Sequence, residues 1–169
     1  MNDGRNELYD YDALSQLPQL KRGTLSDGQI PNPVWQEDFK FDPTGNWHDA
    51  PEVGRGYVTA VNSSETLVQN RAHNPANEIT DITETVGPSW VTPVHDADGN
   101  MTTIPQPGSP TNSYNCTWDA WNRLVRVSTS AGTVAEYAYD GLNRRVSKTI
   151  SSTTRHYYYT NRWQALALR

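Results

Sequence analysis

Five aspartates recur along the chain, each directly after an aromatic residue or a histidine: Asp12, Asp42, Asp96, Asp119 and Asp140. Two carboxylates about 6.5–9.5 Å apart can hydrolyse a glycosidic bond with inversion, one as acid and the other as base. If each copy lies two strands further along a sheet, successive carboxylates are about 9–10 Å apart, which suits such a pair. A catalytic pair needs two different environments, however, and a repeat gives its members the same one. We therefore predict a structural role for these carboxylates and no catalytic residues.

The segment "HDADGN", residues 95–100, places Asp96, Asp98 and Asn100 at alternate positions, like the start of a calcium-binding loop. An EF-hand loop needs glycine at its sixth position and a bidentate carboxylate at its twelfth. Counted from Asp96, these positions hold Met101 and Pro107. The sequence therefore argues against a calcium loop of this type.

Four histidines and one cysteine are the remaining candidates for metal binding or nucleophilic chemistry: His48, His73, His95, His156 and Cys116. His73 and His95 occupy the position that an aromatic residue holds in other copies, so we interpret them as strand residues. Cys116 lies two residues before Trp118 and is expected to be a packed thiol on the same strand face. No Ser-His-Asp spacing signature, glycine-rich phosphate loop or Cys-x-x-Cys motif is present. The sequence predicts no metal site, no cofactor and no enzyme activity.

Composition favours strands and tight turns over helices. The chain has 6 Trp, 9 Tyr and 2 Phe but only 2 Met, together with many Thr, Ser and Asn residues. Its net charge of -5 gives no general attraction to nucleic acid or to an anionic membrane. No segment approaches the roughly 18 apolar residues of a membrane span, and no signal peptide is recognisable. We predict an all-β protein whose localisation stays open.

The aspartates belong to a repeat with an underlying period of about 21 residues. Its aromatic position is held by Tyr11, Phe41, His73, His95, Trp118, Tyr139 and, in a degenerate last copy, Tyr159. The repeated turns are expected near residues 9–17, 39–47, 71–79, 93–101, 116–124, 137–145 and 157–163. We predict one repeat region over residues 1–169. Loop insertions are expected where Pro and Gly gather, at about 22–34, 48–56 and 105–113.

Each copy reads as a β-hairpin that leads into another hairpin. In "EYAYDGLNRRVSKTI", Tyr137 and Tyr139 alternate with small residues before the turn, and Val146 and Ile150 alternate after it. Another turn, "SSTT", follows. The pattern predicts a meander of antiparallel strands with one turn about every ten residues.

The turn residues are of types that cap and close turns. A carboxylate at the first position accepts hydrogen bonds from backbone N–H groups two or three residues later, and Asn or Gly tolerates positive φ. We expect two lengths: three residues from Asp119 to Asn122, but four from Asp42 to Asn46, with Gly45 relieving the strain of the longer turn. The predicted turn residues are Asp12, Asp42, Gly45, Asn46, Asn74, Asn77, Asp96, Gly99, Asn100, Asp119, Asn122, Asp140 and Asn143.

The segments "YDYDALSQL", "FKFDPTGNW", "HDADGNMTTI", "TWDAWNRL" and "EYAYDGLNRR" resemble the tyrosine-aspartate (YD) repeats of the RHS (rearrangement hotspot) family, bacterial type. The resemblance implies a strip of serial β-hairpins that spirals into a hollow shell. In complete relatives the shell encloses a C-terminal toxin domain or, in animal teneurins, supports adhesion, and such proteins are often secreted or displayed on the cell surface. The function implied for this chain is that of a non-catalytic shell segment, with the rest of a longer shell or its cargo as partner.

No core-boundary segment and no toxin domain follow the repeats, and the chain begins within a repeat, so we expect a fragment of a longer shell protein. Uncovered sheet edges predict that the chain alone associates with itself. The alternative is a binding module whose exposed aromatics stack on carbohydrate or on a surface protein. Its candidate residues are Trp35, Trp47, Trp90 and Trp163.

Overall fold

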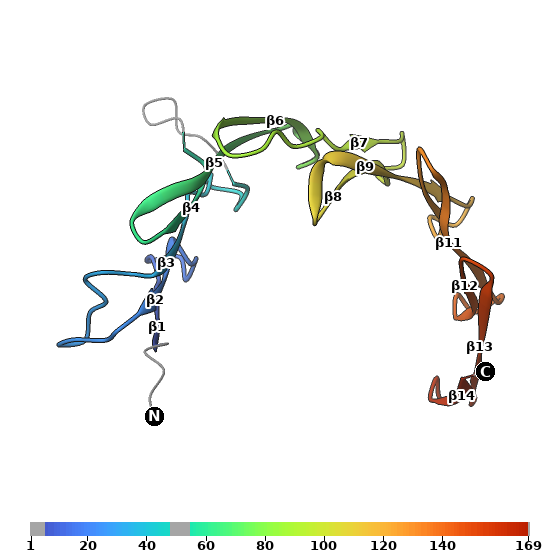
Figure 1. Cartoon of the computed structure of the whole chain (residues 1–169). Coiled ribbons are helices and arrows are strands. Elements are labelled where there is room, and N and C mark those ends of the chain that lie inside the picture. Colours follow the sequence, from blue (N-terminus) through green and yellow to red (C-terminus); the bar gives the residue numbers. More distant parts are fainter. Residues whose placement is uncertain (1–5, 48–54, 169) are drawn as a thin grey trace. The chain divides into compact units, whose positions relative to one another are not determined.

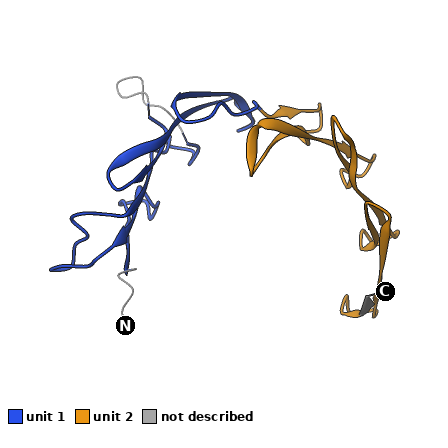
Figure 2. Cartoon of the chain, viewed as in Figure 1, with its two compact units in different colours: residues 1–92 blue, residues 93–169 orange. Residues whose placement is uncertain are grey.

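A computed structural model describes residues 6–47 and 55–168 of the chain. Residues Met1–Thr92 and Pro93–Arg169 form two compact units, unit 1 and unit 2 (Figure 2). Each unit contains one antiparallel sheet in which neighbouring strands follow the order of the sequence (Figure 1). The described residues contain no helix, which confirms the predicted all-β class and the serial hairpins.

Unit 1 has a six-stranded sheet in the order β1 to β6. Its strands are β1 (Asn6–Asp10), β2 (Gln19–Gly23), β3 (Trp35–Phe39), β4 (Tyr57–Val61), β5 (Ser64–His73) and β6 (Ile79–Val86). Phe41 and Trp47 form a bridge beyond the end of β3.

Unit 2 has an eight-stranded sheet in the order β7 to β14. Its strands are β7 (Val94–His95), β8 (Met101–Gln106), β9 (Ser109–Trp118), β10 (Leu124–Thr129), β11 (Gly132–Tyr139), β12 (Arg145–Ile150), β13 (Thr153–Tyr159) and β14 (Ala165–Leu168).

Every second connection between consecutive strands contains a recurring five-residue segment, which we call a corner. Its residues are positions 0 to 4, where position 0 is the predicted turn aspartate or its replacement. The described residues contain seven corners: 12–16, 42–46, 74–78, 96–100, 119–123, 140–144 and 160–164. Each corner is named below by the number of its position 0.

One register recurs in four of the strand pairs that connect successive corners. The residue at position 7 lies opposite the residue at position −4 of the following corner. The pairs are Gln19 with Asp38, Thr103 with Asn115, Arg126 with Glu136 and Ser147 with His156. A shared register means that successive hairpins are set on their neighbours in the same way in both units.

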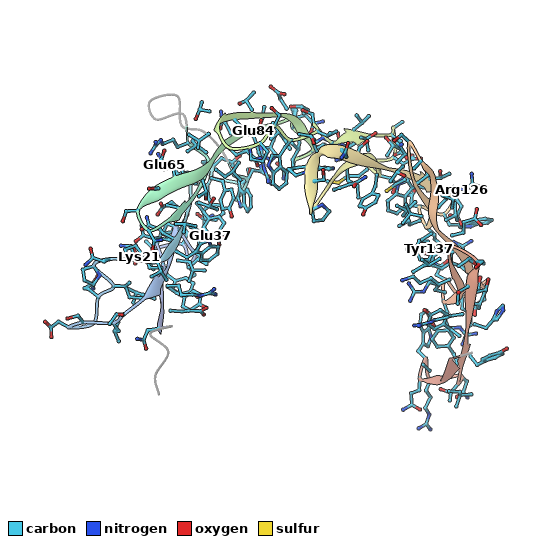
Figure 3. The ribbon with its side chains drawn as sticks, viewed as in Figure 1. Lys21, Glu37, Glu65, Glu84, Arg126 and Tyr137 are labelled. Carbon is cyan, nitrogen blue, oxygen red and sulfur yellow. The ribbon has the colours of Figure 1, made fainter. Side chains whose placement is uncertain are left out.

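The two faces of each sheet carry different side chains. Lys21 and Glu37 project from opposite faces of the unit 1 sheet, and Arg126 and Tyr137 from opposite faces of the unit 2 sheet (Figure 3). The face of Tyr137 also carries the buried Ala135. Side chains stand on both faces of each single-layer sheet, so burial relies on neighbouring hairpins and not on a second layer among the described residues.

The predicted insertions have different outcomes. Residues 105–113 are not a loop, because β8 and β9 run through them and are joined at Pro107 and Gly108. The prolines are tolerated in these strands because neither has to donate an N–H to the strand on its outer side. Pro105 lies beyond the residues of β8 that pair with β7, and Pro110 lies beyond the residues of β9 that pair with β10. Within the predicted insertion 22–34, residues 24–34 connect β2 to β3. The insertion at 48–56 falls largely on residues 48–54, outside the described residues.

Candidate functional site

All seven corners of the described chain have the same hydrogen bonds. The N–H of position 0 donates to the carbonyl of position 4, and the N–H of position 3 donates to the carbonyl of position 0. The side-chain oxygen of position 0 accepts from the N–H groups of positions 2 and 4, as Asp119 Oδ1 does at 2.9 and 3.1 Å. Thr160 makes the same bonds through Oγ1, so the degenerate copy is a complete corner. The carboxylates therefore bind backbone of their own turn.

The expectation of two turn lengths is wrong. Gly45 and Gly99 have positive φ at position 3, where Asn77, Asn122 and Asn143 have it in other corners. Gly45 therefore does not absorb an extra residue; it is the residue that takes the left-handed conformation in its corner. Asn46 and Asn100, predicted to end longer turns, stand at position 4. Only position 3 needs positive φ, so the Asn at position 4 does not mark a longer turn.

In four corners the side chain at position 4 also binds the next corner. Asn46 Nδ2 binds the carboxylate of Asp42 at 3.1 Å and Oδ1 of Asn77 in the following corner at 3.0 Å. Asn100 Nδ2 binds Asp96 and, at 3.0 Å, Oδ1 of Asn122. An amide at this position therefore joins position 0 of its own corner to position 3 of the next.

Arginine at position 4 makes the same link with more bonds. Arg123 pairs with Asp119 at 2.8 Å, and its Nη1 donates to the carbonyl of Asp140 and to Oδ1 of Asn143. Arg144 pairs with Asp140 at 2.7 Å and donates to the carbonyl of Thr160. We name the corners and their position 4 links the corner row. Arg123 and Arg144 are not among the predicted turn residues, although "WNR" and "LNR" place an arginine after the left-handed Asn in both copies.

The aromatic residue before a corner binds the preceding repeat. Tyr139 donates its hydroxyl to the carbonyl of Leu124 at 2.9 Å, and Tyr159 donates to that of Arg145 at 3.0 Å. Trp118 Nε1 donates to the carbonyl of Met101 at 2.8 Å. Each acceptor is at position 5 of the previous corner. Each donor thus holds the strand that enters a corner against the strand that leaves the one before.

Replacing Tyr139 by phenylalanine is expected to destabilise unit 2 by about 0.5–1.5 kcal/mol, the usual net value of one hydrogen bond. The ring stays, so its packing against the Arg123 guanidinium, 5.0 Å from the ring centre, is kept. Tyr158→Phe is the control because its side chain is exposed on β13, which β12 separates from the strand of Tyr139. Urea unfolding followed by tryptophan fluorescence measures both, and equal effects would contradict the assigned role of the Tyr139 hydroxyl.

The electrostatics of the corner carboxylates oppose acid–base catalysis. Hydrogen bonds from the Thr44 side chain and from Asn46 hold the pKa of Asp42 far below its ordinary value, and bonds from Asn100 lower the pKa of Asp96. Burial raises the pKa of Asp119 and Asp140, but bonds from the arginine at position 4 and from backbone N–H groups outweigh it, so the net direction is down. All four are lowered, whereas a catalytic pair needs one raised carboxyl to act as acid.

The lowered pKa values predict that the corner row weakens in acid. The stabilisation is present above the unfolded-state aspartate pKa of about 3.9 and is lost as the pH falls below it, through the folded-state values. Between pH 7 and 5 we expect little change from these groups. Between pH 4 and 2, hydrogen-exchange protection of the Leu142 and Arg144 amides, which bind Asp140, should fall more than that of the Arg162 and Gln164 amides, which bind the non-ionising Thr160. An equal loss at both corners would contradict this origin.

The described part of the chain contains no assembled site for metal binding or for nucleophilic chemistry, the other candidates considered from the sequence. No group of three His, Cys, Asp or Glu side chains there could hold a metal ion, and no helix there is long and apolar enough to cross a membrane. His48 lies outside the described residues. Cys116 is buried, and burial raises the pKa of its thiol, which disfavours the nucleophilic thiolate. In unit 1 a groove of about 790 Å³ is lined by compensating charges, among them Lys21, Asp38, Arg55 and Glu65.

The tryptophans fall into two groups. Trp47 stacks on Tyr57 with ring centres 4.6 Å apart and carries the Arg71 guanidinium at 4.1 Å, so it belongs to an aromatic cluster of unit 1. Trp35 and Trp90 are partly buried. Trp121 and Trp163 are 71% and 57% exposed and lie at the tips of their corners. Of the four predicted binding tryptophans only Trp163 is exposed, and Trp121 is not among those four.

Residues 118–160 match the family model described as RHS Repeat. The matched residues contain corners 119 and 140 and end at position 0 of corner 160. This segment of the chain is an RHS repeat. No curated protein sequence matches it. Among solved structures, the chain is similar to a chain in the crystal structure of TcdB2-TccC3-TEV, with a TM-score of 0.58 and 13% identity. The alignment covers 96% of this chain and 9% of the solved chain, so the likeness concerns the fold of a small part of the solved chain. Family and fold support a structural repeat role.

Proposed function

We propose that this chain is a segment of an RHS shell wall that encloses or scaffolds a C-terminal, toxin-like domain, and that it has no catalytic activity of its own. The corner row carries this proposal. In corners 42, 96, 119 and 140 the residue at position 4 is bonded to the next corner. The aromatic before corners 119, 140 and 160 is bonded to the strand that leaves the preceding corner. Polar side chains that could form a site are thereby used to hold hairpin to hairpin. Such a sheet extends by adding repeats, which is the property that a wall requires.

The test begins with the DNA on both sides of the reading frame. We expect it to encode further tyrosine-aspartate repeats and a C-terminal domain. Co-expressed with the product of the neighbouring repeats, the chain should purify as a stoichiometric complex that protects this domain from protease. Absence of further repeats, or a C-terminal domain cleaved as fast in the complex as alone, would remove the proposal.

A second candidate function is carbohydrate or protein binding at the corner tips. Trp121, Leu142 and Trp163 are exposed large apolar side chains on three successive corners. Exposed aromatic rings can stack on sugars or anchor a protein partner. A glycan array with the intact chain, Trp121→Ala and Trp163→Ala tests the carbohydrate form. A signal that both substitutions reduce supports it, and no tryptophan-dependent signal removes it.

A further inference from the structure

The first and last strands of the described chain each have one free edge. In unit 1, β1 is the end strand and pairs only with β2; in unit 2, β14 is the end strand and pairs only with β13, as far as the described residues go. Free edges present unpaired N–H and C=O groups, which favour pairing with another strand. What pairs with them depends on register, side-chain partners and charge.

The recurring register specifies how the two edges fit each other. Position 7 of corner 160 is Ala167, in β14, and position −4 of corner 12 is Leu8, in β1. The four observed pairs of this kind place position 7 opposite position −4. If β1 of a second copy follows β14 by the same rule, Leu8 lies opposite Ala167 in an antiparallel pair.

The side chains that link neighbouring repeats are also present on the two edges. Gln164 is the exposed position 4 residue of the last corner, an amide like Asn46 and Asn100 that can donate to the next corner. Tyr11 is the aromatic before the first corner and is 62% exposed. In the joined arrangement its hydroxyl faces the carbonyl of Ala165, which is position 5 of corner 160 and corresponds to the acceptors of Tyr139 and Tyr159.

The charges of the two edges are complementary. Residues 1–92 contain 6 Lys and Arg against 14 Asp and Glu, a net charge of -8, and residues 93–169 contain 8 against 5, a net charge of +3. Near the first edge Glu7, Asp10 and Asp12 are exposed, whereas Arg155 and Arg162 are exposed near the last. Opposite charges steer these two edges together and disfavour pairing of an edge with its own copy.

We propose that copies of this chain associate head to tail, with β14 of one copy paired to β1 of the next in the register that joins Ala167 to Leu8. The contact is heterologous, so each added copy leaves a free edge at both ends and the assembly grows with concentration. This arrangement rests on the corner register and not on any enclosed domain, so it can fail or hold independently of the proposed shell function.

Disulfide formation between single-cysteine substitutions tests the register. Opposed residues of an antiparallel pair have Cα atoms about 4.5–5.5 Å apart, within disulfide range. A mixture of the Leu8→Cys and Ala167→Cys proteins should give a covalent dimer under mild oxidation on a non-reducing gel. Neither protein alone should give one, and the double variant should give a ladder of multimers. The unsubstituted chain, which keeps its buried Cys116, controls for the native thiol.

Light-scattering chromatography provides the second measurement. The unsubstituted chain should show a mass that rises with concentration and falls in 1 M salt, and Tyr11→Phe should shift this association to higher concentration. A monomer at every concentration would overturn the inference. The inference would also be overturned if the chain forms larger species but the mixture of Leu8→Cys and Ala167→Cys cross-links no more than each variant alone. The copies would then associate through other surfaces.

Discussion

Replacing Ile30 by alanine is expected to lower the free energy of unfolding of unit 1 by about 2–5 kcal/mol, the range for truncation of a buried isoleucine. Ile30 is 2% exposed although it lies in the connection between β2 and β3. It packs on the backbone of Gly23, where an added Cβ would lie 2.8 Å from its Cγ2. The connection is therefore anchored to the sheet by Ile30. Truncating this side chain to alanine leaves a cavity at the contact with Gly23.

Leu25→Ala is the matched control, because Leu25 belongs to the same connection but is exposed. It should change stability by no more than about 0.5 kcal/mol. Hydrogen exchange measured by mass spectrometry locates the effect, since faster exchange in β2 and β3 is expected for Ile30→Ala alone. If both variants unfold like the unsubstituted chain, the connection is not anchored by Ile30.

Ile30 also illustrates what local patterns could not predict. The alternation in "EYAYD" and the spacing of the aspartates determine strand class, strand order and corner positions, because these depend on side-chain period and local turn chemistry. The segment "SDGQIPNP" can pack on β2 because Gly23 has no side chain. The residues of that segment alone do not indicate this contact. The prolines around 105–113 predicted a loop, because proline is acceptable in these strands only where the pairing with the neighbouring strand has already ended. That end point is not visible in the local sequence.

At the corners the sequence identified the residues but not all of their partners. Capping by Asp119 follows from its residue type and its distance to the N–H groups of its own turn. The contact of Arg123 with Asn143 crosses 20 residues and requires the register of successive hairpins. The same register shows that Asn46 corresponds to Arg123 and not to Asn122. Long-range side-chain roles thus depend on which corners lie next to one another, which local sequence patterns do not specify.

Replacing Arg123 by alanine is expected to destabilise unit 2 by about 1–3 kcal/mol, the range for hydrogen bonds to charged groups, reduced because the site is partly open to water. The guanidinium binds Asp119, the carbonyl of Asp140 and Asn143 at once. It also lies 5.1 Å from the ring centre of Trp121, a cation–π distance. Its loss therefore disconnects corner 119 from corner 140.

Arg126→Ala separates this linking role from the loss of an ordinary ion pair. Arg126 pairs with Glu136 at 3.1 Å, but its side chain is 53% exposed, against 19% for Arg123, so its removal should cost about 0–1 kcal/mol. Urea unfolding gives the two values, and hydrogen exchange should show faster exchange of the Leu142 and Arg144 amides only in Arg123→Ala. Equal destabilisation by both substitutions would mean that the position 4 links do not hold successive hairpins together. A larger effect of Arg123→Ala, seen in the next corner as well as its own, would show that the stability of each repeat depends on its neighbour, as a wall built from hairpins requires.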